Sequence, residues 1–122
     1  SMTIAVERPL QKRLHKYIEE RFGSFVDVAP WGGPNSVLEI GAKGVQKAVG
    51  VERLANYYHI DRQNVIAFGD EHNDNEMIEY AGTGVAMRNA TDQLKAIADD
   101  VTDLNNDQDG MADYLSKTLK LA

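Results

Sequence analysis

The residues best suited to do chemistry lie between positions 69 and 74, where the chain reads Gly-Asp-Glu-His-Asn-Asp. Asp70 and Asp74 are four residues apart on a loop that turns into a helix, so their carboxylates can converge on one hard cation. Mg²⁺ prefers oxygen ligands and usually keeps several waters and a substrate phosphate. Asn73 offers an amide donor to a phosphate oxygen. The alternative is an ordinary strand–turn–helix in which Asp and Asn only cap the helix.

Lys47 is the second candidate, because it opens a predicted helix directly behind Gly44-Val45-Gln46. A lysine at a helix N-terminus works against the helix dipole. If its side chain points at a site, it adds positive charge where backbone N–H groups already favour an anion. The alternative is a solvated surface lysine.

The elements that must position these side chains follow from the apolar pattern. Residues 64–68 form a short apolar run that ends at Gly69-Asp70, as a buried parallel strand would, and residues 82–87 form a second. A short third strand is expected to end at Val101. Helices are expected at 47–58, after 74, at 91–98 and at 109–119, and Thr91 is expected to be the N-cap of the third. This alternation predicts a parallel sheet with catalytic residues at the carboxyl ends of its strands. Asn89 follows the second strand at such an end.

The inward face of each helix is also predicted by the spacing of its apolar residues. In the helix at 47–58, one face carries Val51, Leu54, Ala55 and Tyr58, and in the last helix the inward residues would be Met111, Leu115 and Leu119.

The first 40 residues have a different order of predicted elements. Apolar residues at helical spacing follow Pro9 and stop at Gly23, and two short strands are expected at 25–29 and 36–40, with Trp31 in the turn between them. This is a small α+β unit. We place the division of the chain at residues 41–44, giving parts 1–42 and 43–122.

The composition excludes several classes of function. The net charge is −6, which is unfavourable for binding nucleic acid or an anionic membrane surface. There are no cysteines, so disulfides and thiolate chemistry are excluded. No apolar run approaches the roughly 20 residues that span a bilayer, and we expect a cytoplasmic protein.

Several motifs, taken in order, resemble those of the Cof-type phosphatases of the haloacid dehalogenase (HAD) superfamily. The resemblance covers roughly residues 36–120, and its most specific parts are Gly-Asp-x-x-Asn-Asp and the later Gly-Val-Ala-Met-x-Asn-Ala. It implies an α/β fold in which residues 43–122 are the C-terminal part of a Rossmann-like core and residues 1–42 are a remnant of the α+β cap.

The resemblance also implies roles for individual residues. Lys47 matches the lysine that holds the transferring phosphoryl group, Asp70 the aspartate that binds Mg²⁺, and Asp74 the second acidic residue, which supports the metal or its waters. Asn73 matches an asparagine that contacts phosphate, and Asn89 is a weaker candidate at the rim. The substrates of such enzymes are small phosphorylated metabolites.

The family's nucleophile motif, an apolar strand followed by Asp-x-Asp-Gly, is not found upstream. The only Asp-x-Asp-Gly is at 107–110, where no apolar strand precedes it, and we interpret it as a loop and helix cap. We therefore expect a truncated chain with little or no phosphatase activity alone. The strand at 64–68 would then have an open edge, which predicts self-association.

Alternative functions remain at this point. The chain could be a non-catalytic remnant that binds a partner or a metal. Residues 105–110 partly match a calcium loop, but the twelfth position is Ser116 instead of the usual glutamate. A generic nucleotide-binding domain is disfavoured because the sequence contains neither a dinucleotide-binding glycine motif nor a P-loop.

Overall fold

The structure, a computed structural model, describes residues 1–31 and 34–121. The chain divides into two compact units, Ser1–Val45 and Gln46–Ala122, so the division lies three residues beyond the one expected from the sequence. The expected turn at 30–35 includes residues 32–33, which lie outside the described residues.

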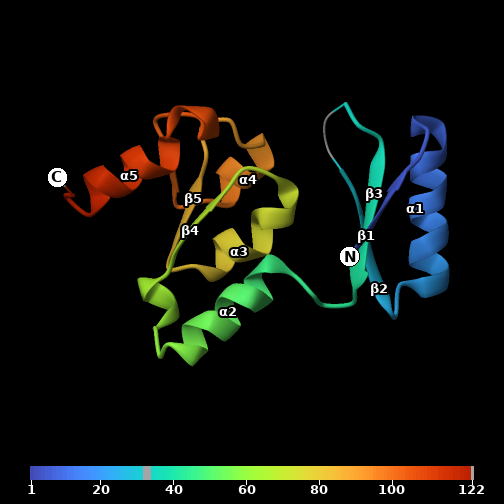
Figure 1. The fold of residues 1–122 in the computed structure, drawn as a ribbon, viewed down its shortest axis with the longest axis horizontal. Helices are drawn as coiled ribbons and strands as arrows, with labels where there is room; N and C mark the ends of the chain where they lie inside the picture. The colour runs from blue at the N-terminus through green and yellow to red at the C-terminus, as the bar shows by residue number, and fades with distance from the viewer. Residues whose placement is uncertain (32–33, 122) are drawn as a thin grey trace. The chain divides into compact units, whose positions relative to one another are not determined.

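The first unit is a three-stranded antiparallel sheet with one helix (Figure 1). Its elements are β1 (Met2–Ala5), α1 (Arg8–Phe22), β2 (Val26–Pro30) and β3 (Val37–Ala42), and the strand order is β1-β3-β2. Helix α1 packs against β2 and β3, and Ile18 and Leu38 are buried. The predicted helix and both predicted strands are confirmed.

Strand β1 was not predicted. It pairs with β3 over Met2↔Ile40 to Ala5↔Val37, partners that are more than 30 residues apart in the sequence. Four residues without flanking turn signals give no local pattern, because this strand exists only through its long-range partner.

The second unit contains a parallel sheet with strand order β4-β5-β6. Its strands and α-helices are α2 (Lys47–Tyr57), β4 (Ile66–Gly69), α3 (Asn75–Tyr80), β5 (Thr83–Ala86), α4 (Asp92–Ile97), β6 (Asp100–Val101) and α5 (Gly110–Thr118). Three short 3₁₀ turns lie between them: η1 (Arg62–Asn64), η2 (His72–Asp74) and η3 (Asn106–Gln108). The predicted α/β class and parallel sheet are confirmed.

The core of this unit lies around β4 and β5 and the helices that follow them. Val85 of β5, Ile78 of α3 and Leu94 of α4 are almost completely buried. Burial of each such side chain contributes about 1.5–3 kcal/mol. The ends of β4 and β5 are therefore held by the best-packed part of the unit.

The inward face predicted for the last helix is only partly correct, and the apolar face of α2 is only partly buried. Leu54 and Tyr58 are 60% and 65% exposed, and Met111 and Leu119 are 49% and 53% exposed. Periodicity marks an apolar stripe, but burial also requires an element lying over it, and within the described residues none covers these side chains. In α2 it is Ala55 that is buried.

No helix within the described ranges is both long and apolar enough to cross a membrane.

Candidate functional site

The carboxyl end of β4 leads into a tight loop that holds the acidic residues. Gly69 ends the strand, Asp70 and Glu71 follow, and η2 leads into α3. A Cβ atom on Gly69 would lie 2.6 Å from the Cβ of Asp74. Glycine is therefore required at position 69 because Asp74 folds back against the strand end.

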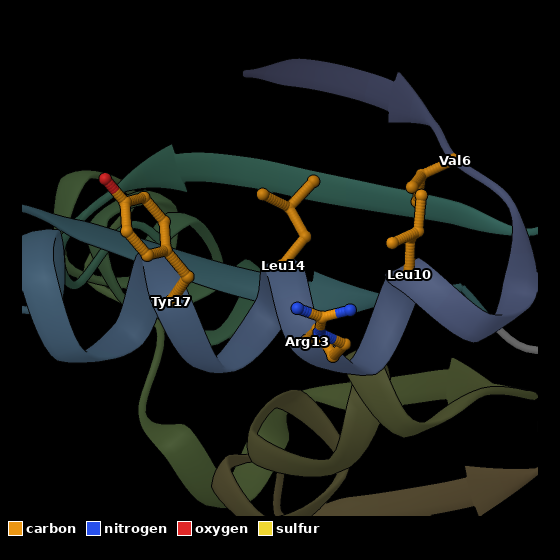
Figure 2. A pocket seen from close by; sticks show the side chains of 5 residues that line it. All are labelled: Val6, Leu10, Arg13, Leu14 and Tyr17. Atoms are coloured by element: carbon orange, nitrogen blue, oxygen red, sulfur yellow. The ribbon is translucent and has the colours of Figure 1, made fainter.

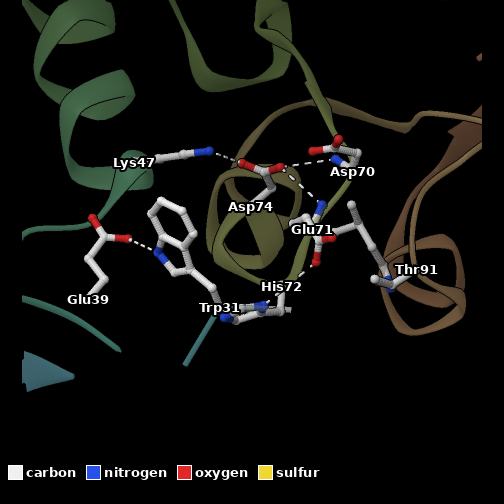
Figure 3. A network of polar contacts seen from close by, with 9 residues as sticks. Trp31, Glu39, Lys47, Asp70, Glu71, His72, Asp74 and Thr91 are labelled. Atoms are coloured by element: carbon white, nitrogen blue, oxygen red, sulfur yellow. Dashed lines mark hydrogen bonds and ion pairs between the residues drawn. The ribbon is translucent and has the colours of Figure 1, made fainter. Parts of the chain in front are cut away.

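Asp74 connects three segments of this unit (Figure 3). It is only 3% exposed. Its Oδ2 accepts the backbone N–H of Asp70 at 3.0 Å and of Glu71 at 3.3 Å. Its Oδ1 accepts a hydrogen bond from Nζ of Lys47 at 2.5 Å. Both carboxylate oxygens are thus engaged, and the charged form of this buried group is fully compensated.

Lys47 is the first residue of α2, and its side chain points at Asp74 (Figure 3). The side chain is 50% exposed although its partner is buried. An ammonium has three donors, so the side open to solvent can still receive an anion. Of the two interpretations of Lys47 from the sequence, the structure shows a side chain that contacts Asp74 and is half open to solvent.

Asp70 has its backbone fixed on both sides. Its N–H donates to Asp74, and its carbonyl oxygen accepts the N–H of Thr91 at 3.1 Å. Burial raises the pKa of its carboxyl, and the nearby charges of Asp74 and Glu71 raise it further, while Lys47 acts in the opposite direction. A cation beside this carboxylate would relieve the repulsion.

The pKa of Asp74 is shifted the other way. Burial alone would raise it, but the hydrogen bonds from Lys47 and from the backbone of Asp70 and Glu71 bring it below its ordinary value. Two neighbouring carboxyls with opposite shifts are a feature of functional sites, although structural ion pairs also produce it.

Mg²⁺ fits these residues in one particular way. Within the described residues no group of three or more His, Cys, Asp or Glu side chains is arranged to hold a metal. A Mg²⁺ site needs only one or two carboxylates, because waters and a substrate phosphate complete the coordination. Asp70 would bind the ion, and Asp74 would support the site through its hydrogen bonds to Lys47 and to the backbone of Asp70.

The two asparagines of the predicted site are placed differently. Asn73 lies in η2 of the same loop and is exposed. Asn89 follows β5, and its Oδ1 accepts the N–H of Asn106 at 2.9 Å, which ties it to η3. The loop at 107–110 forms the end of η3 and the start of α5, as expected.

Two other polar residues noted in the sequence have partners within their own units. His72 lies 3.9 Å from a carboxylate oxygen of Glu71. In the first unit, the ring N–H of Trp31 donates to Glu39 at 3.2 Å, between the end of β2 and the middle of β3.

The first unit also has a groove beside α1, shown in Figure 2. Its lining is mostly apolar, with the guanidinium of Arg13 and the hydroxyl of Tyr17 as polar groups: Val6, Leu10, Arg13, Leu14 and Tyr17. The groove contains no carboxylate to hold a metal ion, so the proposed metal-dependent chemistry is not assigned to it.

Comparison with known proteins agrees with this arrangement. Residues 2–115 match the family described as haloacid dehalogenase-like hydrolase. The chain belongs to this family. The matched range includes Lys47 and the acidic loop after β4.

Individual relatives support the assignment. The chain is 41% identical over 108 residues to 5-amino-6-(5-phospho-D-ribitylamino)uracil phosphatase YitU of Bacillus subtilis, covering 88% of this chain and 40% of the relative. It is 47% identical over 95 residues to the putative phosphatase YkrA of the same organism, covering 78% of this chain and 32% of the relative. A solved HAD-like hydrolase from Bacteroides thetaiotaomicron superposes with a TM-score of 0.81 at 32% identity, over 95% of this chain and 42% of that one.

The chain thus spans between 32% and 42% of the lengths of these three relatives. Two features of the loop were not foreseen from the sequence: the close approach that requires Gly69, and the hydrogen bond from Thr91 to Asp70. The first depends on how the loop folds Asp74 back onto the strand end, and the second joins segments about 20 residues apart, so neither is given by the residue types alone.

Proposed function

We propose that this chain carries part of the active site of a Mg²⁺-dependent phosphatase that acts on small phosphorylated metabolites. The supporting observation lies at the carboxyl end of β4, where the carboxylate of Asp74 binds both the ammonium of Lys47 and the backbone N–H of Asp70. The charges of Asp74 and Lys47 both act on the carboxyl of Asp70. The carboxyl end of the strands is the edge where parallel sheets place their ligands. The phosphatase names of the relatives agree with it.

Each residue has a distinct role in this proposal. Lys47 binds the transferring phosphoryl group through the N–H donors that Asp74 leaves open. Asp70 binds Mg²⁺, which neutralises charge on the phosphoryl oxygens when bound. Asn73 donates its amide to a phosphate oxygen, and Asn89 stays a weaker candidate at the rim. Asp74 supports the metal site by positioning both Lys47 and the Asp70 loop.

The substrate class can be narrowed for a first test. YitU carries the name of a phosphoribitylamino-uracil phosphatase, and a structural relative at 27% identity is described as a sugar phosphatase. Phosphorylated sugars and sugar alcohols are therefore the first substrates to assay.

A nucleophile is the missing component. HAD phosphatases use an aspartate in Asp-x-Asp-Gly after an apolar strand, and the 122 residues contain this motif only at 107–110, in η3 and α5. We propose that the 122-residue chain alone has little or no activity, since loss of a nucleophile costs on the order of a millionfold in other covalent enzymes. Magnesium-dependent turnover of p-nitrophenyl phosphate by rigorously pure chain would contradict this.

The alternative function is a non-catalytic remnant that binds a partner or a metal. The gene sequence upstream of the codon for Met2 separates the two. An in-frame Asp-x-Asp-Gly after an apolar strand supports the enzyme, whereas a frameshift or stop codon supports the remnant. A cytoplasmic location stays a prediction, which cell fractionation tests.

Self-association through β4 is a further part of the proposal. Within the described residues β4 pairs only with β5. The carbonyls of Val65 and Gly69 accept N–H groups of Thr83 and Met87, so the alternation of a strand directs the backbone groups of Ile66 and Phe68 to the open edge. Such edges recruit other strands.

Light scattering tests the association. We expect a dimer or larger species that dissociates in Ile66→Pro, because the lost N–H faces away from β5 and proline is tolerated at the first residue of a strand. A wild-type chain that stays monomeric at all concentrations would contradict the proposed association.

A further inference from the structure

Thr91 lies between two elements that the proposed active site needs. It is the N-cap of α4, where its Oγ1 accepts the N–H of Leu94 at 3.2 Å. Its own backbone N–H donates to the carbonyl oxygen of Asp70 at 3.1 Å. Figure 3 shows Thr91 beside Asp70 and Glu71. One residue therefore starts a helix and ties that helix to the acidic loop.

The loop that carries Thr91 is itself anchored. After β5, the N–H of Arg88 donates to Oγ1 of the buried Thr102 at 2.9 Å, and the N–H of Ala90 donates to the carbonyl of Met87 at 2.8 Å. Leu94, one turn into α4, is fully buried. The N–H of Thr91 is thus presented from a segment that is fixed on both sides.

The backbone of Asp70 is held by two hydrogen bonds, and one of them comes from Thr91. The N–H of Met87 holds the carbonyl of Gly69 at 2.8 Å, and Asp74 holds the N–H of Asp70. The bond from Thr91 is the remaining backbone constraint on Asp70. With it, the backbone is fixed and only the carboxylate can reorient.

We propose that Thr91 is a positioning residue for the acidic loop at residues 69–74, and that it acts through the hydrogen bond from its backbone N–H to Asp70. This inference rests on the proposed function, in which Asp70 binds Mg²⁺. Small displacements of positioned groups have large effects on reactive geometry, so a loose Asp70 would bind the ion less tightly even though Thr91 never touches it.

Three substitutions separate the hydrogen bond from the Thr91 N–H to Asp70, here called the tether, from the helix cap made by the Thr91 Oγ1. Thr91→Ser keeps both, and Thr91→Ala keeps the N–H but loses the Oγ1 cap. Thr91→Pro loses both, and the φ of −61° at this residue matches the angle that proline fixes. The comparison of Pro with Ala therefore isolates the hydrogen bond to Asp70.

The test is amide hydrogen exchange by NMR, together with a titration using Mg²⁺ and inorganic phosphate. We expect the amides of Asp70 and Glu71 to exchange up to about tenfold faster in Thr91→Pro than in Thr91→Ala, the effect of losing about one hydrogen bond. We expect a similar weakening of Mg²⁺ binding. Equal exchange rates at Asp70 in the two variants would overturn the inference.

A second measurement does not depend on any variant. In the wild-type chain the N–H of Thr91 should exchange more slowly than that of Asp92, which occupies the first helical position and has no intrahelical partner. If Thr91 exchanges as fast as Asp92, the tether is absent. If Thr91 is protected but Mg²⁺ shifts no resonance, the proposed metal function fails while the tether stands.

Discussion

Nζ of Lys47 lies 2.5 Å from Oδ1 of Asp74, so the first residue of α2 is joined to the buried start of α3 by a charged hydrogen bond. A double-mutant cycle with Lys47→Met and Asp74→Asn measures this contact. Because the lysine is half exposed, we expect a coupling free energy of about 1–3 kcal/mol in chemical denaturation, below that of a fully buried pair. A coupling near zero would mean that the pair does not form in solution.

Asp74→Asn alone should lower the free energy of unfolding by about 1–3 kcal/mol, because one side-chain oxygen is replaced by an amide group that cannot accept hydrogen bonds. Asp61→Asn is the matched control, since Asp61 is exposed and makes no side-chain cap bond. We expect its stability to stay within about 0.5 kcal/mol of wild type.

Two glycine substitutions should have opposite effects. Gly69→Ala places a Cβ against Asp74 and should destabilise the protein by about 1–3 kcal/mol through overpacking. Gly50→Ala, in the interior of α2 with no atom near the new Cβ, should stabilise it by about 0.5–1 kcal/mol. Thermal denaturation of both variants checks the pair, and an equal response would contradict the packing described for Gly69.

A pH effect is expected in the first unit. The side chain of Lys43 and the N–H of Gly44 lower the pKa of Asp27 below its ordinary value of 3.8. A carboxyl whose pKa is lowered by folding stabilises the fold above that ordinary value, and this contribution disappears as the pH falls through the lower, folded value. Asp27→Asn should therefore reduce the melting temperature at pH 7 and have a smaller effect at about pH 2.

The control for that experiment is Glu52→Gln, an exposed acidic residue of α2. A pH-independent difference between Asp27→Asn and wild type would show that the carboxylate charge is not what the fold uses.

Asp70 should show a conflict between stability and function. Burial and the charges of Asp74 and Glu71 raise the pKa of this carboxyl, so the folded state disfavours its charge. Asp70→Asn removes that charge and should raise the melting temperature in metal-free buffer, as is common at functional positions. A lower melting temperature than wild type would indicate that the carboxylate has a structural role instead.

Much of the second unit could be predicted because its signals are local. The apolar run ending at Gly69-Asp70 and the N-cap at Thr91 both formed as expected. The position of Lys47 at the start of a helix was predicted, but the helix alone left the direction of its side chain open, and only the family resemblance implied a place in the site. What the sequence could not provide depends on distant partners: β1, which forms only against β3, and the hydrogen bond from Thr91 to Asp70. The exposure of Leu54 and Met111 could not be read from the apolar spacing for the same reason, since the burial of a side chain depends on neighbouring elements.

The most direct test of the account is an NMR titration of the 122-residue chain with Mg²⁺ in the presence of inorganic phosphate, alongside Asp70→Asn. We predict saturable shifts of the Asp70, Asn73, Asp74 and Lys47 amides that require both ions and are lost in the variant. No shift at these residues, or the same shifts in Asp70→Asn, would contradict the assignment of the acidic loop as a magnesium and phosphate site.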